Sequence, residues 1–314
     1  MFGLLLGGMA SVIFALFSEL RDRAFRSPED VESATGTSIM AHLPRLLVRE
    51  LPSRRFDSTK ILPAITTYHA PRTTDAETFR VLRTELLYMA KRDRHKVFMV
   101  TSPSPADGKS TTIANLAVSL AQAGRRVLLV DGDLRRPKIG KLFGLSNSPG
   151  LSDYLMERAS FDQCCAHSPA QNLTLCPEGT PTPQPAELLE SPRFLQFIAH
   201  ARKEFDLVLI DTPPILAVAD PVIAAEVVDA CMLVVRIEKN NRQLIERACQ
   251  ILRDHNVALL GIIVNAAHSR IRNYAYSSYN YYRESEYCHV GRYRKEYEIT
   301  IPAESGCDPN ENPA

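Results

Sequence analysis

The chain has 314 residues, of which 45% are hydrophobic and 23% charged, so it can form one sizeable globular domain with additional segments. Its formal net charge of +1 argues against binding to nucleic acid through bulk electrostatics, and we expect no nucleic-acid partner. The seven cysteines include no C-x-x-C pair and no histidine at zinc-ligand spacing, which indicates a reducing compartment and no metal cluster.

An uncharged apolar run opens the chain between Phe2 and Phe17, and three arginines follow it within residues 21–26. As a helix this run spans roughly 24 Å, slightly less than the ~30 Å hydrocarbon layer of a bilayer, unless it extends to Leu20. A buried core helix is the alternative. Because the basic residues lie on one side only, we predict a transmembrane helix over residues 1–20 with the rest of the chain in the cytoplasm.

Residues 21–74 are rich in Pro, Ser and Thr and contain no chemical motif, so we predict a juxtamembrane connector. From Asp75 onward, Phe79, Leu82 and Leu86 follow the spacing of one apolar helix face. Three charged residues lie on a neighbouring face of this helix, and a solvated surface would explain them adequately: Glu77, Arg80 and Arg83.

Apolar runs alternate with helical stretches from Lys96 onward, beginning with VFMV and VLLV and continuing through LVLI, ACMLVV and ALLGIIV. Runs without polar alternation are typical of strands that helices cover on both faces. We therefore predict a doubly wound, mostly parallel α/β sheet across residues 75–268. In such sheets the ligand site lies at the carboxyl ends of the strands.

The stretch TSPSPADGKST follows the first of these strands and ends like a phosphate-binding loop, although Pro103 replaces the first glycine of the usual G-x-x-x-x-G-K-S/T pattern. Loop amides would bind phosphate oxygens, Lys109 would place its charge beside the β and γ phosphates, and Ser110 would ligate Mg²⁺. Its position between an apolar strand and an amphipathic helix predicts a P-loop NTPase-type domain that binds ATP and Mg²⁺. The expected nucleotide-binding residues of the loop are Asp107, Gly108, Lys109, Ser110 and Thr111.

Carboxylates end two of the predicted strands, Asp131 and Asp133 after VLLV and Asp211 after LVLI. An aspartate at such a position can hold a magnesium ion directly or through water. Any one of them could be a turn former or a helix cap, but three carboxylates at the edge that carries the phosphate loop favour a metal site. We expect Ser110, Asp133 and Asp211 to hold the metal.

The order of these motifs resembles that of the bacterial tyrosine kinases of capsule and exopolysaccharide export, which share the deviant Walker scaffold of chromosome-partitioning and division-site ATPases. The resemblance covers nearly the whole chain: the apolar start, SPEDVE, DAETFRVLRTEL, GKST, DGDLRRP, DTPP and a tyrosine-rich tail. Partitioning ATPases carry a lysine where this chain has Ser104. The resemblance implies a kinase domain over residues 75–268, held in the cytoplasm at the bacterial inner membrane.

Residues 269–314 contain many tyrosines and few aliphatic residues, so we predict a disordered tail. Composition alone would also fit an aromatic partner-binding segment. The resemblance implies instead that the tail is the substrate for autophosphorylation, on Tyr274, Tyr276, Tyr279, Tyr281, Tyr282, Tyr287, Tyr293 and Tyr297.

The resemblance also implies a mechanism, in which the γ-phosphoryl group of ATP passes to a tail tyrosine. We expect three catalytic residues: Lys109 to hold the phosphates, Asp131 to accept the hydroxyl proton, and Asp133 to orient the metal or its waters, although Asp131 and Asp133 could exchange roles. Asp211 would hold the metal from the outer shell. Asn265, which follows GIIV, matches the position where the family scaffold contacts the adenine.

Members of this family carry an E-x-x-R-x-x-R helix that packs between the subunits of a ring, and Glu77, Arg80 and Arg83 match it residue by residue. A tail that begins on the far side of its own domain would reach a neighbouring subunit more readily, which favours phosphorylation in trans. Repeated phosphorylation would add charge and loosen the ring.

Expected partners, besides other copies of the chain and the membrane, are a polysaccharide co-polymerase with its export machinery and a phosphotyrosine phosphatase. Autophosphorylation would then regulate exopolysaccharide polymerisation and export. Many family members have a periplasmic chain-length domain, which here would lie on a separate chain or be missing from the sequence. Two other functions stay open, a membrane-associated ATPase switch and a non-catalytic chain-length scaffold that only binds nucleotide.

Overall fold

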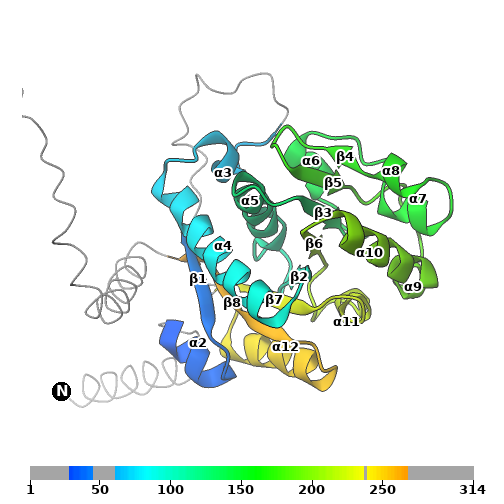
Figure 1. Cartoon of the computed structure of the whole chain (residues 1–314). Coiled ribbons are helices and arrows are strands. Elements are labelled where there is room, and N and C mark those ends of the chain that lie inside the picture. The colour runs from blue at the N-terminus through cyan, green and yellow to red at the C-terminus, as the bar shows by residue number, and fades with distance from the viewer. Residues whose placement is uncertain (1–27, 45–60, 237–238, 268–314) are drawn as a thin grey trace, which may run out of the picture. The chain divides into compact units, whose positions relative to one another are not determined.

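The computed structural model of the chain describes residues 28–44, 61–236 and 239–267 (Figure 1). Within these ranges, eight strands form one sheet in the order β1-β8-β7-β2-β6-β3-β5-β4. Neighbouring strands are parallel except for the antiparallel pair of β4 and β5. The predicted doubly wound, mostly parallel α/β sheet is therefore confirmed. The strands are β1 Ile39–Pro44, β2 Val97–Thr101, β3 Val127–Asp131, β4 Ala166–His167, β5 Leu173–Cys176, β6 Leu207–Asp211, β7 Ala230–Val235 and β8 Leu259–Ala267.

Helices cover both faces of the sheet, because its central strands are apolar on both sides (Figure 1). In β2, Val97 and Met99 join the core of one face, whereas Phe98 and Val100 join the core of the other. One face carries α3 Thr66–His69, α4 Thr74–Asp93, α5 Lys109–Gln122 and α6 Ile139–Phe143. The other carries α2 Pro28–Thr35, α7 Leu151–Leu155, α8 Phe161–Cys164, α9 Pro185–Glu190, α10 Pro192–Glu204, α11 Asp220–Ala225 and α12 Arg242–Asp254.

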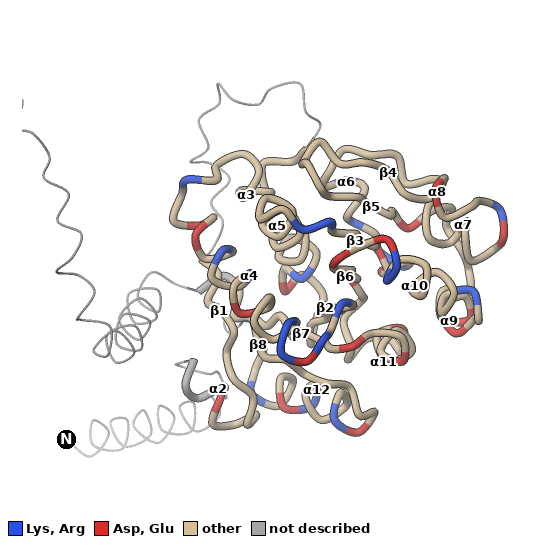
Figure 2. Tube along the Cα trace, viewed as in Figure 1, with Lys and Arg blue, Asp and Glu red and all other residues tan. Residues whose placement is uncertain are grey.

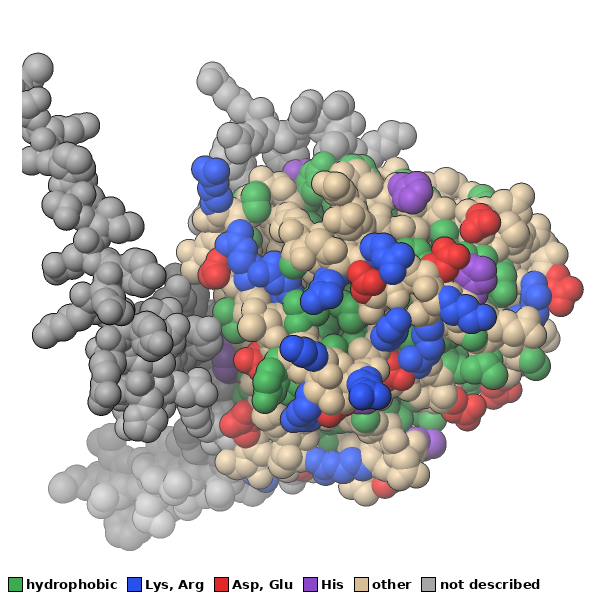
Figure 3. Space-filling view, in the orientation of Figure 1, with side chains coloured by type: hydrophobic (Ala, Val, Ile, Leu, Met, Phe, Trp, Pro, Cys, Tyr) green, Lys and Arg blue, Asp and Glu red, His purple; other side chains and the backbone are tan. Residues whose placement is uncertain are grey.

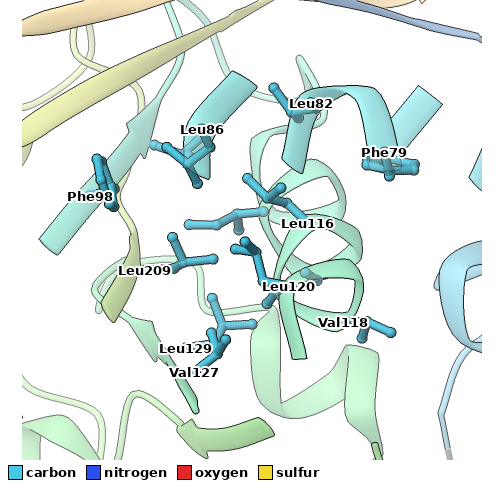
Figure 4. Packing of buried hydrophobic residues seen from close by; sticks show 14 of the residues in the cluster. Phe79, Leu82, Leu86, Phe98, Leu116, Val118, Leu120, Val127, Leu129 and Leu209 are labelled. Carbon is cyan, nitrogen blue, oxygen red and sulfur yellow. The ribbon is translucent and has the colours of Figure 1, made fainter. Parts of the chain in front are cut away.

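The core beneath α4 and α5 holds the phosphate-loop helix against the sheet (Figure 4). Leu116 and Leu120 of α5 lie between the apolar face of α4 and the side chains of β2, β3 and β6. All of these side chains are excluded from solvent, and burial of each leucine contributes about 1.5–3 kcal/mol. The start of α5 is thereby fixed relative to the ends of the strands. The α4 residues that complete this core are Phe79, Leu82 and Leu86, as their spacing predicts.

The folded domain begins earlier than the predicted boundary at residue 75. Helix α2 and strand β1 lie inside the range 21–74 that was expected to be connector, and β1 pairs in parallel with β8. Met40 and Leu43 of β1 are buried. This strand is hard to predict from the sequence, because it is a short apolar stretch between polar neighbours and it pairs with a distant strand.

Within the described ranges, no helix combines the length and the apolar character that crossing a membrane requires. The transmembrane helix predicted over residues 1–20 and the tail predicted over residues 269–314 both lie outside these ranges.

Candidate active site

The phosphate loop connects the end of β2 to the start of α5, and Gly108 is the last residue before the helix. Its backbone has φ of 97°, a conformation that residues other than glycine seldom adopt. A Cβ atom at this position would lie 1.9 Å from Nδ2 of Asn265. Conformation and space therefore both require glycine here.

Asp107 and Asn265 make hydrogen bonds to the backbone of the phosphate loop. The buried carboxylate of Asp107 accepts a hydrogen bond from the Ser104 amide at 2.9 Å and lies 3.3 Å from Nζ of Lys239. Burial raises the pKa of Asp107, although the Ser104 amide and Lys239 oppose the shift. The backbone carbonyl of Asp107 accepts a hydrogen bond from Nδ2 of Asn265 at 2.7 Å. The predicted adenine contact of Asn265 stays a prediction, and the structure adds a role in shaping the loop.

The end of β8 therefore lies beside the phosphate loop. Asn265 is two residues before the end of β8. The position of the tail on the far side of its own domain stays a prediction, because residues 269–314 lie outside the described residues. Lys239, which no motif had indicated, reaches the same loop from the segment before α12.

Lys109 lies at the centre of a buried charge cluster. Its Nζ is 2.9 Å from Oδ2 of Asp133, 3.4 Å from Oδ1 of Asp211 and 3.3 Å from Oγ of Ser110. Burial lowers the pKa of Lys109, but the negative charges of Asp211 and Asp133 outweigh it and the pKa is raised. The structure thus brings together four residues that the sequence placed at the ends of three different strands. Figure 2 marks the acidic and basic residues along the trace.

Asp131 lies at the end of β3, directly paired with Asp211 at the end of β6. Its Oδ2 accepts hydrogen bonds from the amides of Lys138 and Ile139, each at 2.8 Å. Burial and the charge of Asp211 nevertheless raise the pKa of Asp131 well above its usual range. A carboxylate with a raised pKa is a better proton acceptor than an ordinary aspartate.

The residues predicted to hold magnesium fit that ion. Oδ2 of Asp211 is buried and has no hydrogen-bond partner among the described residues. Ser110 and Asp133 are also buried, and both lie against the Lys109 ammonium group. Mg²⁺ usually binds through one or two carboxylates together with phosphate oxygens and water, and a serine of the phosphate loop often completes the set. Among the described residues, no group of three or more His, Cys, Asp or Glu side chains could hold a metal ion.

Two further acidic residues near the site were not predicted. Oδ1 and Oδ2 of the buried Asp220, the first residue of α11, accept hydrogen bonds from Arg135 at 2.9 and 2.8 Å. This pair ties the loop after β3 to α11. Glu178 follows β5, is 4% exposed and has no partner for Oε2 among the described residues. Burial raises the pKa of Glu178. No linear motif predicts the pairing of Asp220 with Arg135 or the burial of Glu178.

The predicted ring-interface residues lie on α4, away from the charge cluster. Arg80 pairs with Glu77 and also donates to the carbonyl of Pro71, and both side chains are partly exposed. Arg83 donates to the carbonyl of Ser119 in α5 at 3.0 Å, and burial lowers the pKa of Arg83.

Lys and Arg side chains are interspersed with Asp and Glu over the face shown in Figure 3, in keeping with the net charge of +1.

The predicted phosphoacceptor tyrosines lie outside the described residues. They are Tyr274, Tyr276, Tyr279, Tyr281, Tyr282, Tyr287, Tyr293 and Tyr297.

A phosphate loop between a strand and a helix, with its lysine held by carboxylates at neighbouring strand ends, defines a P-loop nucleotide-binding domain. Residues 94–302 match the family described as "ParA: NUBPL iron-transfer P-loop NTPase". This match agrees with the class of domain that the sheet and the loop define.

Curated relatives and solved structures specify the family more closely. "Tyrosine-protein kinase YwqD" of Bacillus subtilis is 37% identical over 212 residues, which cover 68% of this chain and 88% of that protein. The structure of "The kinase domain of Escherichia coli tyrosine kinase ETK" has a TM-score of 0.74 and 31% identity, covering 78% of this chain and 96% of that one. The chain belongs to the family of bacterial tyrosine-protein kinases.

Some relatives are much longer than this chain. "Tyrosine-protein kinase wzc" of Salmonella typhimurium is 34% identical over 294 residues, which cover 90% of this chain and 40% of that protein. The chain thus spans about 40% of the length of the first curated relatives that it matches.

Proposed function

We propose that the chain is an ATP-dependent protein-tyrosine kinase that phosphorylates its own C-terminal tyrosine cluster, one copy acting on another. The main support is the Lys109 ammonium group, which Asp133 and Asp211 hold at the strand ends beside Asp131. The family supplies the acceptor, because relatives of 33 to 37% identity are named as tyrosine-protein kinases. Eleven tyrosines occur in the chain, and eight of them lie between residues 274 and 297.

In the proposed reaction, the loop amides and Lys109 bind the phosphates of ATP, and Lys109 exchanges part of its contact with Asp133 and Asp211 for phosphate oxygens. Thr111, at the start of α5, lies with the loop residues that bind the nucleotide, and Asn265 holds the loop in shape beside the adenine. Bound magnesium, held by Ser110, Asp133 and Asp211, supplies charge neutralisation for the transferred group.

Asp131 is the proposed proton acceptor. A tyrosine oxygen forms the new bond to the γ-phosphorus while the bond from that phosphorus to ADP breaks, and the hydroxyl proton passes to Asp131. The raised pKa of Asp131, caused by burial and by Asp211, suits this role. Asp133 accepts a hydrogen bond from the Arg136 amide at 3.0 Å, which holds its carboxylate in position to orient the metal or its waters.

Intact mass spectrometry of the purified full chain, incubated with ATP and Mg²⁺, tests the proposal. Each phosphate adds about 80 Da. We expect several additions on the wild-type chain and on Lys141→Met, which changes a lysine on an exposed position of α6. We expect none on Lys109→Met or on a chain that ends at Ser269. Free phosphate measured in the same samples distinguishes the kinase from an ATPase switch and from a nucleotide-binding scaffold.

An ATPase switch would release phosphate without any added mass, and a nucleotide-binding scaffold would do neither. Either result would overturn the proposed kinase activity. Transfer between copies is tested by mixing the wild-type chain that ends at Ser269 with full-length Lys109→Met. Added mass on the Lys109→Met chain supports transfer in trans. A Lys109→Met chain that stays unmodified in this mixture, although the wild-type full chain is phosphorylated, would show transfer within one copy.

We further propose that the kinase works at the bacterial inner membrane with its catalytic domain in the cytoplasm, and that it regulates capsular or exopolysaccharide polymerisation and export. In support, one relative is named "Putative tyrosine-protein kinase in cps region" of Klebsiella pneumoniae, at 32% identity. The co-polymerase, the export machinery and a phosphotyrosine phosphatase would be its partners. Replacement of the eight tail tyrosines by phenylalanine should change the length of the exported polymer. An unchanged length distribution would contradict this role.

A further inference from the structure

Three cysteines lie close together beside the active site and take no part in the proposed phosphoryl transfer. Cys164 is the last residue of α8, Cys165 follows it, and Cys176 is the last residue of β5. All three are free thiols. Cys164 and Cys176 are buried, whereas Cys165 is partly exposed.

The pairing of β4 with β5 places Cys165 opposite Cys176. In this antiparallel pair, Ala166 is matched with Leu175 and His167 with Thr174, so the next position matches Cys165 with Cys176. Cys165 has φ of −108° and ψ of 118°, so its backbone continues the extended conformation of β4. The two cysteines therefore occupy one cross-strand position, although the strand proper begins one residue later.

The hydrogen bonds of the hairpin identify the kind of position. The amide of Ser168 donates to the carbonyl of Leu173 at 3.0 Å, which marks that pair as hydrogen-bonded. Hydrogen-bonded and non-hydrogen-bonded pairs alternate along an antiparallel ladder, so Cys165 and Cys176 fall at a non-hydrogen-bonded pair. Cα atoms of such pairs are about 4.5 Å apart, within the ~4.4–6.8 Å that a disulfide requires.

The side chains of the two cysteines also face each other. Both pack against the core cluster on the α7–α12 face of the sheet. Burial, followed by the hydrogen-bonding contact with the Cys165 side chain, raises the pKa of the Cys176 thiol. Cys164 is excluded from this cross-strand pair because it ends α8 and lies next to Cys165 in the chain.

We propose that Cys165 and Cys176 are a site of reversible disulfide formation by peroxide. The partly exposed Cys165 thiol would react with hydrogen peroxide to give a sulfenic acid and one water molecule. The Cys176 sulfur would then attack the Cys165 sulfur, and a disulfide and a second water molecule would form. Two thiols are oxidised by two electrons and one peroxide is reduced, so the step is balanced. A dithiol reductant would reverse it.

The position of Cys176 gives this bond a structural consequence. Cys176 is paired with Val130 of β3, the residue that precedes Asp131. The disulfide would therefore link β4 to β5 at a position that pairs with Val130, one residue before Asp131 at the end of β3. The phosphate loop follows β2, and β6 separates β2 from β3 in the sheet.

Thiol labelling of the purified full chain tests the proposal. The chain is treated with hydrogen peroxide, remaining thiols are alkylated without reduction, and tryptic peptides are analysed by mass spectrometry. Arg158 and Arg193 bound one tryptic peptide that contains all three cysteines, since no Lys or Arg lies between them. In the oxidised protein we expect this peptide to carry one label, on Cys164, and to lose about 2 Da as its disulfide forms. Treatment with dithiothreitol should restore three labels.

Variants of single cysteines identify the linked pair. Several variants are used, so that the test still works if one of them fails to fold. Cys164→Ser and the control Cys249→Ser, which lies in α12, should still form the link. Cys165→Ser and Cys176→Ala should each leave the remaining cysteines of the peptide labelled. Three labels on the oxidised wild-type peptide, a link that includes Cys164, or a link between two chains would each overturn the proposal.

Discussion

Asp131 and Asp211 are directly paired across the neighbouring strands β3 and β6, and both carboxyl groups are fully buried. Each of these carboxyl groups has a raised pKa, mainly because of burial. Lys109 opposes the shift at Asp211, which it contacts, and the charge of Asp211 adds to the shift at Asp131. In the proposed mechanism this strand pair supplies Asp211 to hold the cations and Asp131 to accept the proton.

The first prediction concerns Asp131→Asn. Asparagine keeps an acceptor for the amides of Lys138 and Ile139 but cannot accept a proton from a tyrosine. We expect tail phosphorylation to fall at least about 100-fold with nucleotide affinity nearly unchanged. Radiolabel incorporation and titration with a fluorescent nucleotide measure the two effects. The matched control is Asp206→Asn at the opposite end of β6. Phosphorylation at the wild-type rate would remove Asp131 from the mechanism.

The second prediction compares two glycines that both have positive φ. A Cβ atom at Gly124 would have no atom within 4 Å. Gly124→Ala should therefore lower the free energy of unfolding only by the conformational strain of about 1–2 kcal/mol. Gly108→Ala brings the same kind of strain and also forces a Cβ against Asn265. We expect a further loss of about 1–3 kcal/mol in the free energy of unfolding and at least tenfold weaker nucleotide binding. Chemical denaturation and nucleotide titration check both values.

A double variant separates the two causes at Gly108. Adding Asn265→Ala should restore part of the lost stability, because the nearest clash is with the Asn265 amide. Equal stabilities for Gly108→Ala with and without Asn265→Ala would show that the clash is not the cause.

The third prediction concerns the pH dependence that Glu178 contributes. Burial raises the pKa of Glu178, so the folded state favours its protonated form. This contribution to stability is complete below the unfolded pKa of about 4.3 and is lost as the pH rises through the folded pKa. Glu178→Gln should therefore flatten the fall in the free energy of unfolding above about pH 5, by at most about 1.4 kcal/mol per pH unit.

Urea denaturation at a series of pH values measures this slope. The matched control is Glu190→Gln, because Glu190 is an exposed residue at the end of α9. Its slope should equal that of the wild type. A slope for Glu178→Gln that also equals the wild-type slope would mean that Glu178 ionises normally in the folded chain.

The fourth prediction concerns assembly through α4. The side chain of Arg80 is partly exposed, so a second copy of the chain could contact it beside Glu77. We expect Arg80→Ala to weaken self-association at least about tenfold, which is about 1.4 kcal/mol, as measured by analytical ultracentrifugation. Arg92→Ala, on the last turn of the same helix, should assemble like the wild type. Arg83 is a poorer probe, because it also binds the carbonyl of Ser119 and its loss would disturb the packing of α5.

The central part of the fold could be predicted because each buried strand is a continuous apolar run and each strand end carries a recognisable motif. Lys109, Asp133 and Asp211 follow directly from that pattern, and the structure brings them within hydrogen-bonding distance. The edge of the sheet could not be predicted in the same way. Strand β1 is short, and its burial depends on pairing with β8 more than two hundred residues later in the chain.

The contacts that support the site could not be predicted from the sequence either. The buried Asp220 pairs with Arg135, and Glu178 is buried without a partner for Oε2 among the described residues. The adenine contact of Asn265 stays a prediction, and the hydrogen bond from its amide to the Asp107 carbonyl has no signal in the sequence. Pairings of this kind depend on where loops from different strands meet, and no local spacing encodes them.

The hydrogen bond from Asn265 to Asp107 makes β8 a mechanical link between two parts of the chain. Whatever pulls on the polypeptide after Ala267 pulls first on the strand that props the phosphate loop. Linkage then requires reciprocity: if nucleotide occupancy changes how freely that strand end moves, a load on the strand end must change nucleotide affinity by the same free energy. The contact between the Asn265 amide and the Asp107 carbonyl is the place where such a coupling would act.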